Sequence, residues 1–370
     1  MNLVRARLGE IAEVAAGGGA PQDAEAFTDQ GMPFIRAGSL KPLVSGASES
    51  TLEHLTEEVA KQHGLRKFPR DTVVFAKSGM SATKGHIYRL RNDAYVVNHL
   101  AALIPSKKII PKFLEHSLRV FSPICLIQDA AYPSIRLSDI ATMQIPLPPR
   151  PEQRWIAEVL DRSEALRAKR GAALGELDSL IHSIFLDLFG DPVSNPRDWP
   201  QESLDTFFYF KTGKLDSNAA VASGQYPFFT CSREDYRIDT YAFNCEALLL
   251  AGNNASADYS VKHYKGKFNA YQRTYVITLR DDRNSYDYAQ FVLGHRLGEL
   301  KRISKGTNTK YLTMELLNRI RVPVPPQKLQ REFTRRVQRV EKLKTAQLAS
   351  LAELDALFAT LQHRAFRGEL

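Results

Sequence analysis

The sequence contains few cysteines and no long hydrophobic run. Three cysteines, Cys125, Cys231 and Cys245, occur in 370 residues, an odd number with scattered spacing. This pattern argues against a disulfide framework and a structural zinc site, and it is typical of a reducing cytoplasm. No stretch approaches ~18 consecutive apolar residues, so we expect no transmembrane helix and no membrane partner. Met1–Arg7 has arginines without an apolar stretch behind them, so we expect no secretory signal.

Signatures of catalysis and metal binding are also missing. There is no G-x-x-x-x-G-K-[ST] phosphate loop and no Asn/Asp-Pro-Pro-aromatic run of the amino-methyltransferase kind. The nine histidines show no metal-ligand spacing with one another or with cysteine. Glu299-Leu300-Lys301 could be half of a nuclease signature, but it lacks an upstream acid and is better interpreted as a surface helix turn. We therefore expect no catalytic residue, no metal ligand and no cofactor bound by this chain.

Size and charge are more informative. A chain of 370 residues fits two or three domains, and 44% hydrophobic residues are enough for sizeable cores. The 50 Lys and Arg exceed the 41 Asp and Glu, which gives a net charge of +9. This excess is compatible with a polyanionic partner such as nucleic acid, or simply with a soluble basic protein. Charge alone does not separate the two interpretations.

The chain repeats itself. Residues 145–154 (IPLPPRPEQR) are similar to residues 322–331 (VPVPPQKLQR), at an offset of 177. At that offset an ungapped alignment of Pro146–Phe189 has 15 identities in 44 positions. Weaker similarities precede each copy in the same order: GMPFI with YPFFT, TVVFAKSG with ALLLAGNN, and YVVNHLAAL with NAYQRTYVI. The sequence therefore predicts two copies of one unit, each a globular half followed by a helical segment.

The two matched segments are expected to be long helices. Each lacks proline over about 40 residues and is rich in strong helix formers. Apolar residues recur at helical spacing and predict a narrow coiled-coil seam, so each helix should pair with the other copy. The predicted seam residues are Ile156, Leu160, Leu166, Leu174, Leu177, Ile181 and Ile184 in the first helix, and Phe333, Val337, Val340, Leu343, Leu351, Leu354, Phe358 and Leu361 in the second.

Polar and glycine residues interrupt these helices. Arg170 and the equivalent Gln347 either fix the register of the seam or point outward. Gly171 and Gly175 indicate either close helix approach or a local kink. The first helix should end at Gly190, in the left-handed conformation that glycine tolerates.

The globular halves have a mixed α/β pattern. Short runs rich in Val, Ile, Tyr and Phe predict strands at Pro33–Ala37, Thr72–Ala76, Ala94–Ile104, Pro227–Thr230, Ala247–Ala251 and Ala270–Thr278. Helical patterns cover Thr51–Gln62 and Tyr286–Leu300.

Basic and amide side chains gather in loops at matching places of the two halves. Arg, Lys, Asn and Gln read base edges, and Ser, Thr and Lys also hold phosphates. A solvated loop is the alternative for any one of them. The candidate DNA-binding residues are Arg36, Lys77, Ser78, Ser81, Lys84, Asn98 and His99 in the first half, and Lys214, Arg233, Asn253, Asn254, Lys262, Gln272, Arg273, Lys305, Thr307 and Lys310 in the second.

Specific motifs resemble a known family. The run from Pro148 to Ala157 (PPRPEQRWIA) and the segment Phe185–Pro196 (FLDLFGDPVSNP), followed by Trp199, are similar to the conserved regions of specificity (S) subunits of Type I restriction-modification enzymes. Asp71–Gly79 and Val97–Leu100 resemble the strands and loops of the family's target-recognition domains. The second helix start departs from the pattern, since leucine stands where the first has Glu152.

The resemblance implies an α+β fold: two mixed α/β target-recognition domains separated by two long antiparallel coiled-coil helices, in a pseudo-two-fold tandem repeat. The implied division is 1–144 for the first recognition domain, 145–190 for the central conserved region with the first helix, 191–321 for the second recognition domain with its linker 191–200, and 322–370 for the C-terminal conserved region with the second helix.

The resemblance also implies a function. A non-catalytic subunit of this kind binds double-stranded DNA at a bipartite asymmetric target, and each domain reads one half-site. The paired helices set the spacer and dock two modification (methyltransferase) subunits, and two restriction subunits can join them. S-adenosylmethionine, ATP and Mg²⁺ are used by those partner subunits and not by this chain, which is expected in the cytoplasm. The alternatives are a free-standing DNA-binding regulator without methyltransferase partners, an enzyme with an unrecognised site, and a coiled-coil scaffold.

Overall fold

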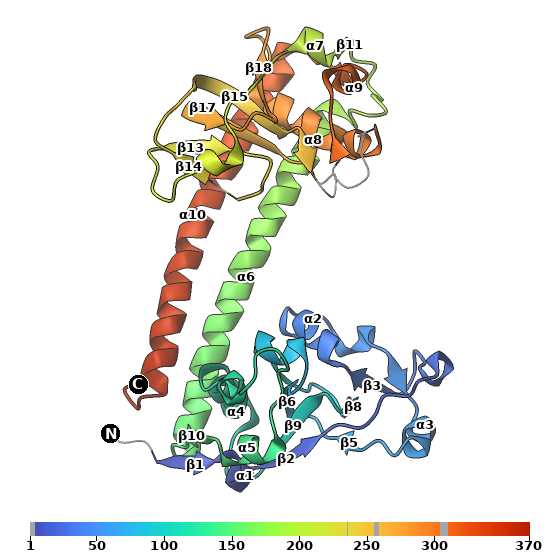
Figure 1. Cartoon of the computed structure of the whole chain (residues 1–370), viewed down its shortest axis with the longest axis vertical. Helices are drawn as coiled ribbons and strands as arrows, with labels where there is room; N and C mark the ends of the chain where they lie inside the picture. The colour runs from blue at the N-terminus through green and yellow to red at the C-terminus, as the bar shows by residue number, and fades with distance from the viewer. Residues whose placement is uncertain (1–3, 235, 255–258, 304–309) are drawn as a thin grey trace. The chain divides into compact units, whose positions relative to one another are not determined.

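The structure is a computed structural model that describes residues 4–234, 236–254, 259–303 and 310–370 (Figure 1). The chain forms two compact units: the first comprises Met1–Arg170 and Ser350–Leu370, and the second comprises Gly171–Ala349. Each unit contains one α/β domain and part of each of two long helices, α6 (Arg150–Phe189) and α10 (Gln327–Ala365). The predicted fold class, with two mixed domains and two long helices, is confirmed.

The domain of the first unit is built on two four-stranded sheets, in the orders β2-β9-β6-β7 and β4-β3-β8-β5, and a separate strand pair, β1 with β10. Its strands are β1 (Arg5–Arg7), β2 (Ala12–Ala16), β3 (Met32–Ile35), β4 (His54–Leu55), β5 (Lys67–Phe68), β6 (Val73–Ala76), β7 (Ile87–Arg89), β8 (Ala94–Val96), β9 (Leu100–Pro105) and β10 (Gln144–Pro146). Its helices are α1 (Leu8–Ile11), α2 (Leu40–Val44), α3 (Glu57–Gln62), α4 (Pro111–Val120) and α5 (Leu137–Thr142).

The domain of the second unit has one six-stranded sheet in the order β12-β18-β15-β17-β13-β14, with two separate pairs, β11 with β20 and β16 with β19. Its strands are β11 (Gln201–Ser203), β12 (Phe208–Thr212), β13 (Tyr226–Phe229), β14 (Tyr236–Ile238), β15 (Phe243–Ala251), β16 (Asn253–Asn254), β17 (Val261–Ala270), β18 (Thr274–Leu279), β19 (Lys310–Tyr311) and β20 (Arg321–Pro323). Its helices are α7 (Leu204–Phe207), α8 (Tyr286–Ile303) and α9 (Met314–Leu317).

The two domains repeat the same connections. The pair β1·β10 corresponds to β11·β20, and both pairs are antiparallel. The parallel contact of Phe34 with Tyr95 corresponds to that of Phe228 with Asn269. In the second unit the long strand β17 takes the places of both β7 and β8. The weak similarity between the globular halves therefore reflects a real structural repeat.

Two of the predicted strands are each interrupted by a turn. Ala94–Ile104 is divided into β8 and β9, and the run Ala270–Thr278 is divided between the last residue of β17 and strand β18. The predicted helix Thr51–Gln62 is helical only in α3, because a short 3-10 turn and strand β4 occupy its first residues. The hydrophobic runs predicted the correct locations of these strands. They did not reveal the turns, because each turn consists of a few polar residues flanked by apolar ones.

Most predicted seam residues face the protein interior. Ile156 and Leu160 are buried in the core of the first unit, and Phe358 and Leu361 pack against the same core. In the second unit the core contains buried seam residues from both helices, with further seam residues packed against it: Ile181, Phe333, Val337 and Val340, with Leu177 and Ile184. Leu174, Leu351 and Leu354 are half-buried. Each long helix therefore stabilises two domain cores as well as the helix pair.

Leu166 and Leu343 are wrongly placed in the predicted seam. They are 53% and 54% exposed. Counting in alternating steps of three and four from Leu160 to Leu174 passes through residues 163, 167 and 170, so Leu166 lies one position outside the seam. Arg167 and its equivalent Lys344 occupy the seam instead, and each forms an ion pair with the opposite helix.

Arg170 and Gln347 lie on the seam and are half-buried, which favours the register interpretation over outward-pointing side chains. A Cβ added at Gly171 or Gly175 would meet no heavy atom within 4 Å, so these glycines do not mark close helix approach. Helix α6 continues unbroken through both, and nothing in the structure explains them. Gly190 has a φ of +76° and ends α6 as predicted. No helix in the described part of the chain is long and apolar enough to span a membrane.

Candidate nucleic-acid interface

Two tight turns present the candidate reading residues of the two domains. Between β8 and β9, the Leu100 amide donates to the carbonyl of Val97 at 3.0 Å, which leaves Asn98 and His99 at the tip of the turn. Between β17 and β18, the Thr274 amide donates to Tyr271 O at 2.8 Å, which leaves Gln272 and Arg273 at the equivalent tip. All four tip side chains are exposed. A short rigid turn fixes these side chains more tightly than a long loop would.

A second loop lies beside the turn in the first unit. The Lys77 amide donates to His99 O at 2.9 Å, and the Ser78 hydroxyl is 2.8 Å from His99 Nδ1. The loop preceding α5 adds a third segment, because the Ile135 amide donates to Lys77 O at 2.8 Å and Ser78 pairs with Ser134. The structure thus brings Lys77, Ser78 and His99 together at one edge.

The second unit repeats this edge with different side chains. The Gly252 amide donates to Arg273 O at 2.8 Å, and the Leu312 amide donates to Gly252 O at 2.8 Å. Strands β16 and β19 pair Asn254 with Lys310 through their backbones. The backbone scaffold is therefore the same in both units, while the side chains on it differ.

Glycines allow the loops after β2 and β12 to reach these turns. A Cβ at Gly17 would lie 1.9 Å from Val96 O, and a Cβ at Gly213 would lie 1.7 Å from Ala270 O. No other residue could make this close approach. Lys214 follows directly and is exposed beside the second turn.

A polar cavity of about 440 Å³ lies next to the turn of the second unit. The cavity is lined mainly by hydroxyl and amide side chains and two tyrosines: Ser217, Asn218, Thr230, Ser232, Tyr236, Asn253 and Tyr271, together with Cys231. The Cys231 thiol donates to Arg273 O at 3.4 Å. These are groups that can donate to and accept from bases.

The remaining candidates lie in different environments. Arg36 donates to Glu53 Oε2 at 2.7 Å and lies over the ring of Phe27, so its charge is already paired. Lys262 Nζ donates to the carbonyl of Arg233 at 3.2 Å. Ser81 and Lys84 belong to a 3-10 turn after β6, where Lys84 is exposed. Lys305 and Thr307 lie outside the described residues, as does the side chain of Asn254.

The first turn of each long helix contains a buried glutamine that belongs to the repeated Pro-Pro motif. Gln153 is 1% exposed; it accepts from the Ile110 amide at 2.9 Å and donates to Pro148 O at 2.8 Å. Gln330 is also 1% exposed; it accepts from the Ser285 amide at 2.9 Å and donates to Pro325 O at 3.0 Å. Each amide therefore joins the start of a long helix to the residue preceding α4 or α8 in its domain.

A comparison with known protein families shows to which family the chain belongs. The family described as Type I restriction modification DNA specificity domain matches residues 3–174 and 196–353, most of the chain. The chain belongs to this family. The family is non-catalytic, in agreement with the prediction that the chain is not an enzyme.

Individual relatives agree with this assignment. The chain is 39% identical over 130 residues to the Type I restriction enzyme EcoDI specificity subunit of Escherichia coli, covering 35% of this chain and 28% of that protein. It is 27% identical over 148 residues to the MjaIX specificity subunit of Methanocaldococcus jannaschii, covering 39% of this chain and 34% of that protein. The matched region spans only about a third of each curated relative.

Solved structures share the fold. A Type I restriction-modification S subunit from M. genitalium superposes with a TM-score of 0.63 at 14% identity, covering 99% of this chain and 96% of that chain. A structure on complex assembly and conformational transition of the type I R-M system gives a TM-score of 0.57 at 18% identity and covers all of both chains.

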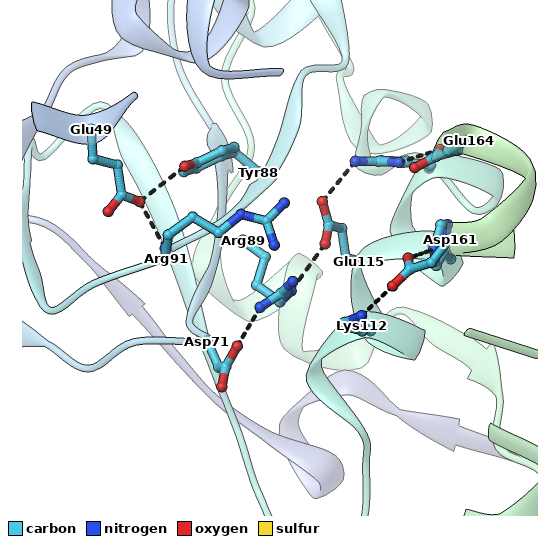
Figure 2. A network of polar contacts seen from close by, with 11 residues as sticks. Glu49, Asp71, Tyr88, Arg89, Arg91, Lys112, Glu115, Asp161 and Glu164 are labelled. Carbon is cyan, nitrogen blue, oxygen red and sulfur yellow. Dashed lines mark hydrogen bonds and ion pairs between the residues drawn. The ribbon is translucent and has the colours of Figure 1, made fainter. Parts of the chain in front are cut away.

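A polar network joins the domain of this specificity-family chain to α6 in the first unit (Figure 2). Buried Arg89 pairs with Asp71 and with Glu115, whose Oε2 is 3.1 Å from Arg89 Nε. Arg119 continues the network to Glu115 and to Glu164 on α6, each at 2.6 Å. The network therefore crosses from β7 through α4 to the long helix.

Asp161 is a second connection from α4 to α6. It pairs with Lys112, and its Oδ1 is 2.8 Å from Nε2 of buried His116. Burial by itself would raise the pKa of Asp161, but the hydrogen bonds from His116 and Lys112 outweigh it and lower the pKa to about 2. His116, Asp161 and Glu164 are close enough to share a metal ion, yet Lys112 and Arg119 already neutralise both carboxylates. We assign no metal to this group.

One exposed aromatic residue at the first edge, Tyr132, is not among the residues predicted from the sequence. Tyr132 is 82% exposed in the loop that continues to Ser134, the residue paired with Ser78. A tyrosine hydroxyl can contact phosphates. In the sequence, Tyr132 is a single aromatic residue in a polar loop. Composition alone does not show whether such a side chain is exposed or buried.

Proposed function

We propose that this chain is the DNA-recognition subunit of a Type I restriction-modification complex. It binds a bipartite asymmetric target in double-stranded DNA, and the domains 1–144 and 191–321 each read one half-site through the edges described above. The main support is the pair of equivalent turns, Asn98-His99 and Gln272-Arg273, which place different base-reading side chains on the same backbone scaffold. S-adenosylmethionine, ATP and Mg²⁺ belong to partner subunits in the cytoplasm.

The long helices set the spacer and dock two methyltransferase subunits. Each unit exposes an equivalent leucine pair next to the seam: Leu166 and Leu357 in the first unit, and Leu343 and Leu180 in the second, all 45% to 54% exposed. Each of these leucines stands one residue before a seam residue, so the pairs lie on corresponding sides of their helices. Two equivalent apolar surfaces fit two copies of one partner.

The decisive experiment is a methylome of the host with and without this gene. Loss of one bipartite adenine-methylated motif, with all other motifs retained, supports the function. An unchanged methylome, or purified chain that neither binds DNA nor co-purifies with a methyltransferase, contradicts it.

Docking is tested by the stoichiometry of the complex. The variant Leu166→Ser/Leu357→Ser should bind one methyltransferase instead of two in native mass spectrometry. Leu348→Ser is the matched control, because Leu348 is 54% exposed on α10 and has a glycine at the equivalent position of α6. Two bound subunits in the double variant would refute this docking surface.

A further inference from the structure

Five cations form an exposed stripe on α10 within the second unit. The residues are Lys328, Arg331, Arg335, Arg339 and Lys342, and all five are exposed. Their steps of three, four, four and three residues place them on one side of a helix. We call this set the basic stripe. The opposite side of the same helix carries Phe333, Val337 and Val340, which are buried in the unit's core.

The stripe has little internal charge compensation. Arg335 pairs with Glu332, which is also paired with Arg336. Within the described part of the chain, Lys328, Arg331, Arg339 and Lys342 have no acidic partner. Like charges one turn apart destabilise a helix by roughly 0.2–0.5 kcal/mol per pair. The stripe thus opposes helix stability and is best explained by an anionic partner.

The first copy of the repeat shows that the long helix does not require this stripe. At the offset of 177, α6 has Pro151, Arg154, Glu158, Arg162 and Ala165 in place of the five cations. The five α6 positions therefore carry a formal charge of +1 and the basic stripe carries +5, although the aligned segments that begin at Pro146 and Pro323 share 15 of 44 residues. The excess positive charge is therefore present on α10 and absent from the equivalent positions of α6. A role of this charge would be confined to the second copy of the repeat.

We propose that the basic stripe binds phosphates of the DNA spacer without reading its sequence. The proposal rests on the proposed function, in which the helices lie between two half-sites and the spacer is read by neither domain. Long arginine and lysine side chains on a straight helix bind phosphates independently of base sequence. From Lys328 to Lys342 the stripe is about 21 Å long, the length of about six base pairs.

The test compares salt dependence between matched variants of the full chain in its assembled complex. Arg331→Gln/Arg339→Gln/Lys342→Gln removes three cations and keeps Arg335 with its partner Glu332. Arg154→Gln/Arg162→Gln is the control, because it changes equivalent positions on α6. For the triple variant, the slope of log Kobs against log[salt] should become shallower by about 2 to 3, at about 0.9 per lost contact, on targets with any spacer sequence. The control should keep the wild-type slope.

Neutral methylphosphonates in the spacer locate the contact. They should reduce the slope for wild-type protein and leave the triple variant unchanged. An unchanged slope in the triple variant, or equal sensitivity of both proteins to the methylphosphonates, overturns the inference. If the variant instead loses a methyltransferase subunit while its DNA slope is unaltered, the stripe faces an acidic protein and the inference is wrong. Absence of DNA binding by the wild-type complex would refute the proposed function itself.

Discussion

Arg167 on α6 donates from Nε to Oδ1 of Asp355 on α10 at 2.5 Å. The repeat supplies the same pair a second time, because Lys344 on α10 binds Oδ1 of Asp178 on α6 at 2.7 Å. Arg167 corresponds to Lys344 and Asp178 to Asp355 at the offset of 177. An early residue of one helix thus meets a late residue of the other within each unit, which is the antiparallel pairing that the family resemblance implied.

Charge reversal should reveal this pairing. Arg167→Asp alone should lower the free energy of unfolding by about 0.5 to 1 kcal/mol, because it places two carboxylates together at a partly exposed site. Adding Asp355→Arg should restore most of the loss. Urea unfolding of the four proteins in a double-mutant cycle measures the coupling, and Asp178 and Lys344 offer an equivalent cycle. Strictly additive effects in both cycles would exclude the pairing.

Removing the buried amide at the start of a long helix should be costly. Gln153→Ala leaves the Ile110 amide and the Pro148 carbonyl without their partner, so we expect a loss of about 2 to 3 kcal/mol. Gln330→Ala should behave similarly in the second unit. Gln338→Ala is the control, because this glutamine is exposed on α10. Urea unfolding provides the comparison, and a loss below about 0.5 kcal/mol would contradict the buried role.

The connection through Asp161 should depend on pH. Its pKa in the folded chain is about 2, below its ordinary value of 3.8. A lowered folded-state pKa means that ionised Asp161 stabilises the fold fully above about pH 4, and that this contribution disappears as the pH falls toward 2. Asp161→Asn should therefore cost about 2 kcal/mol at pH 7. The difference from wild type should shrink between pH 4 and 2, whereas exposed Glu158→Gln should show little difference at any pH. A constant cost over that range would rule out the linkage.

Helix length should set the spacer. Deleting residues 171–174 of α6 and the equivalent 348–351 of α10 removes about 6 Å and about 40° of rotation from each helix. One base pair adds about 3.4 Å and about 34° to DNA. We expect a spacer shorter by one or two base pairs with both half-sites unaltered in the methylome. Replacing the same residues by alanine preserves the helix length and should preserve the spacer length. An unchanged spacer length after the deletion would show that helix length does not set the spacer.

The two turns should act on different half-sites. Arg273→Ala should relax specificity at one or two base pairs of one half-site, costing about 1–3 kcal/mol against the preferred base. His99→Ala should do the same at the other half-site. Binding to a panel of single-base target variants separates the two effects. If both variants relax the same half-site, the assignment of one domain to each half-site is wrong.

Much of the architecture could be predicted because apolar residues recur at regular helical spacing along both long helices. Leu160 and Val337 are separated by the repeat offset, and both are buried as the seam requires. The same periodicity misplaced Leu166, because hydrophobicity cannot reveal that Arg167 has an acidic partner on another helix. The split of Ala94–Ile104 was missed because a two-residue tip between apolar strands barely interrupts a hydrophobic run.

The sequence by itself determined the duplication, the two long helices and the polar loops, since helix propensity, periodicity and internal similarity are local properties of the chain. Only the tertiary structure decided which loops share an edge, as when Lys77, His99 and Ile135 meet through backbone hydrogen bonds. It also decided that Arg36 is already paired with Glu53. The physical reason is that partners distant in the chain meet only through sheet pairing and packing, which no local pattern encodes.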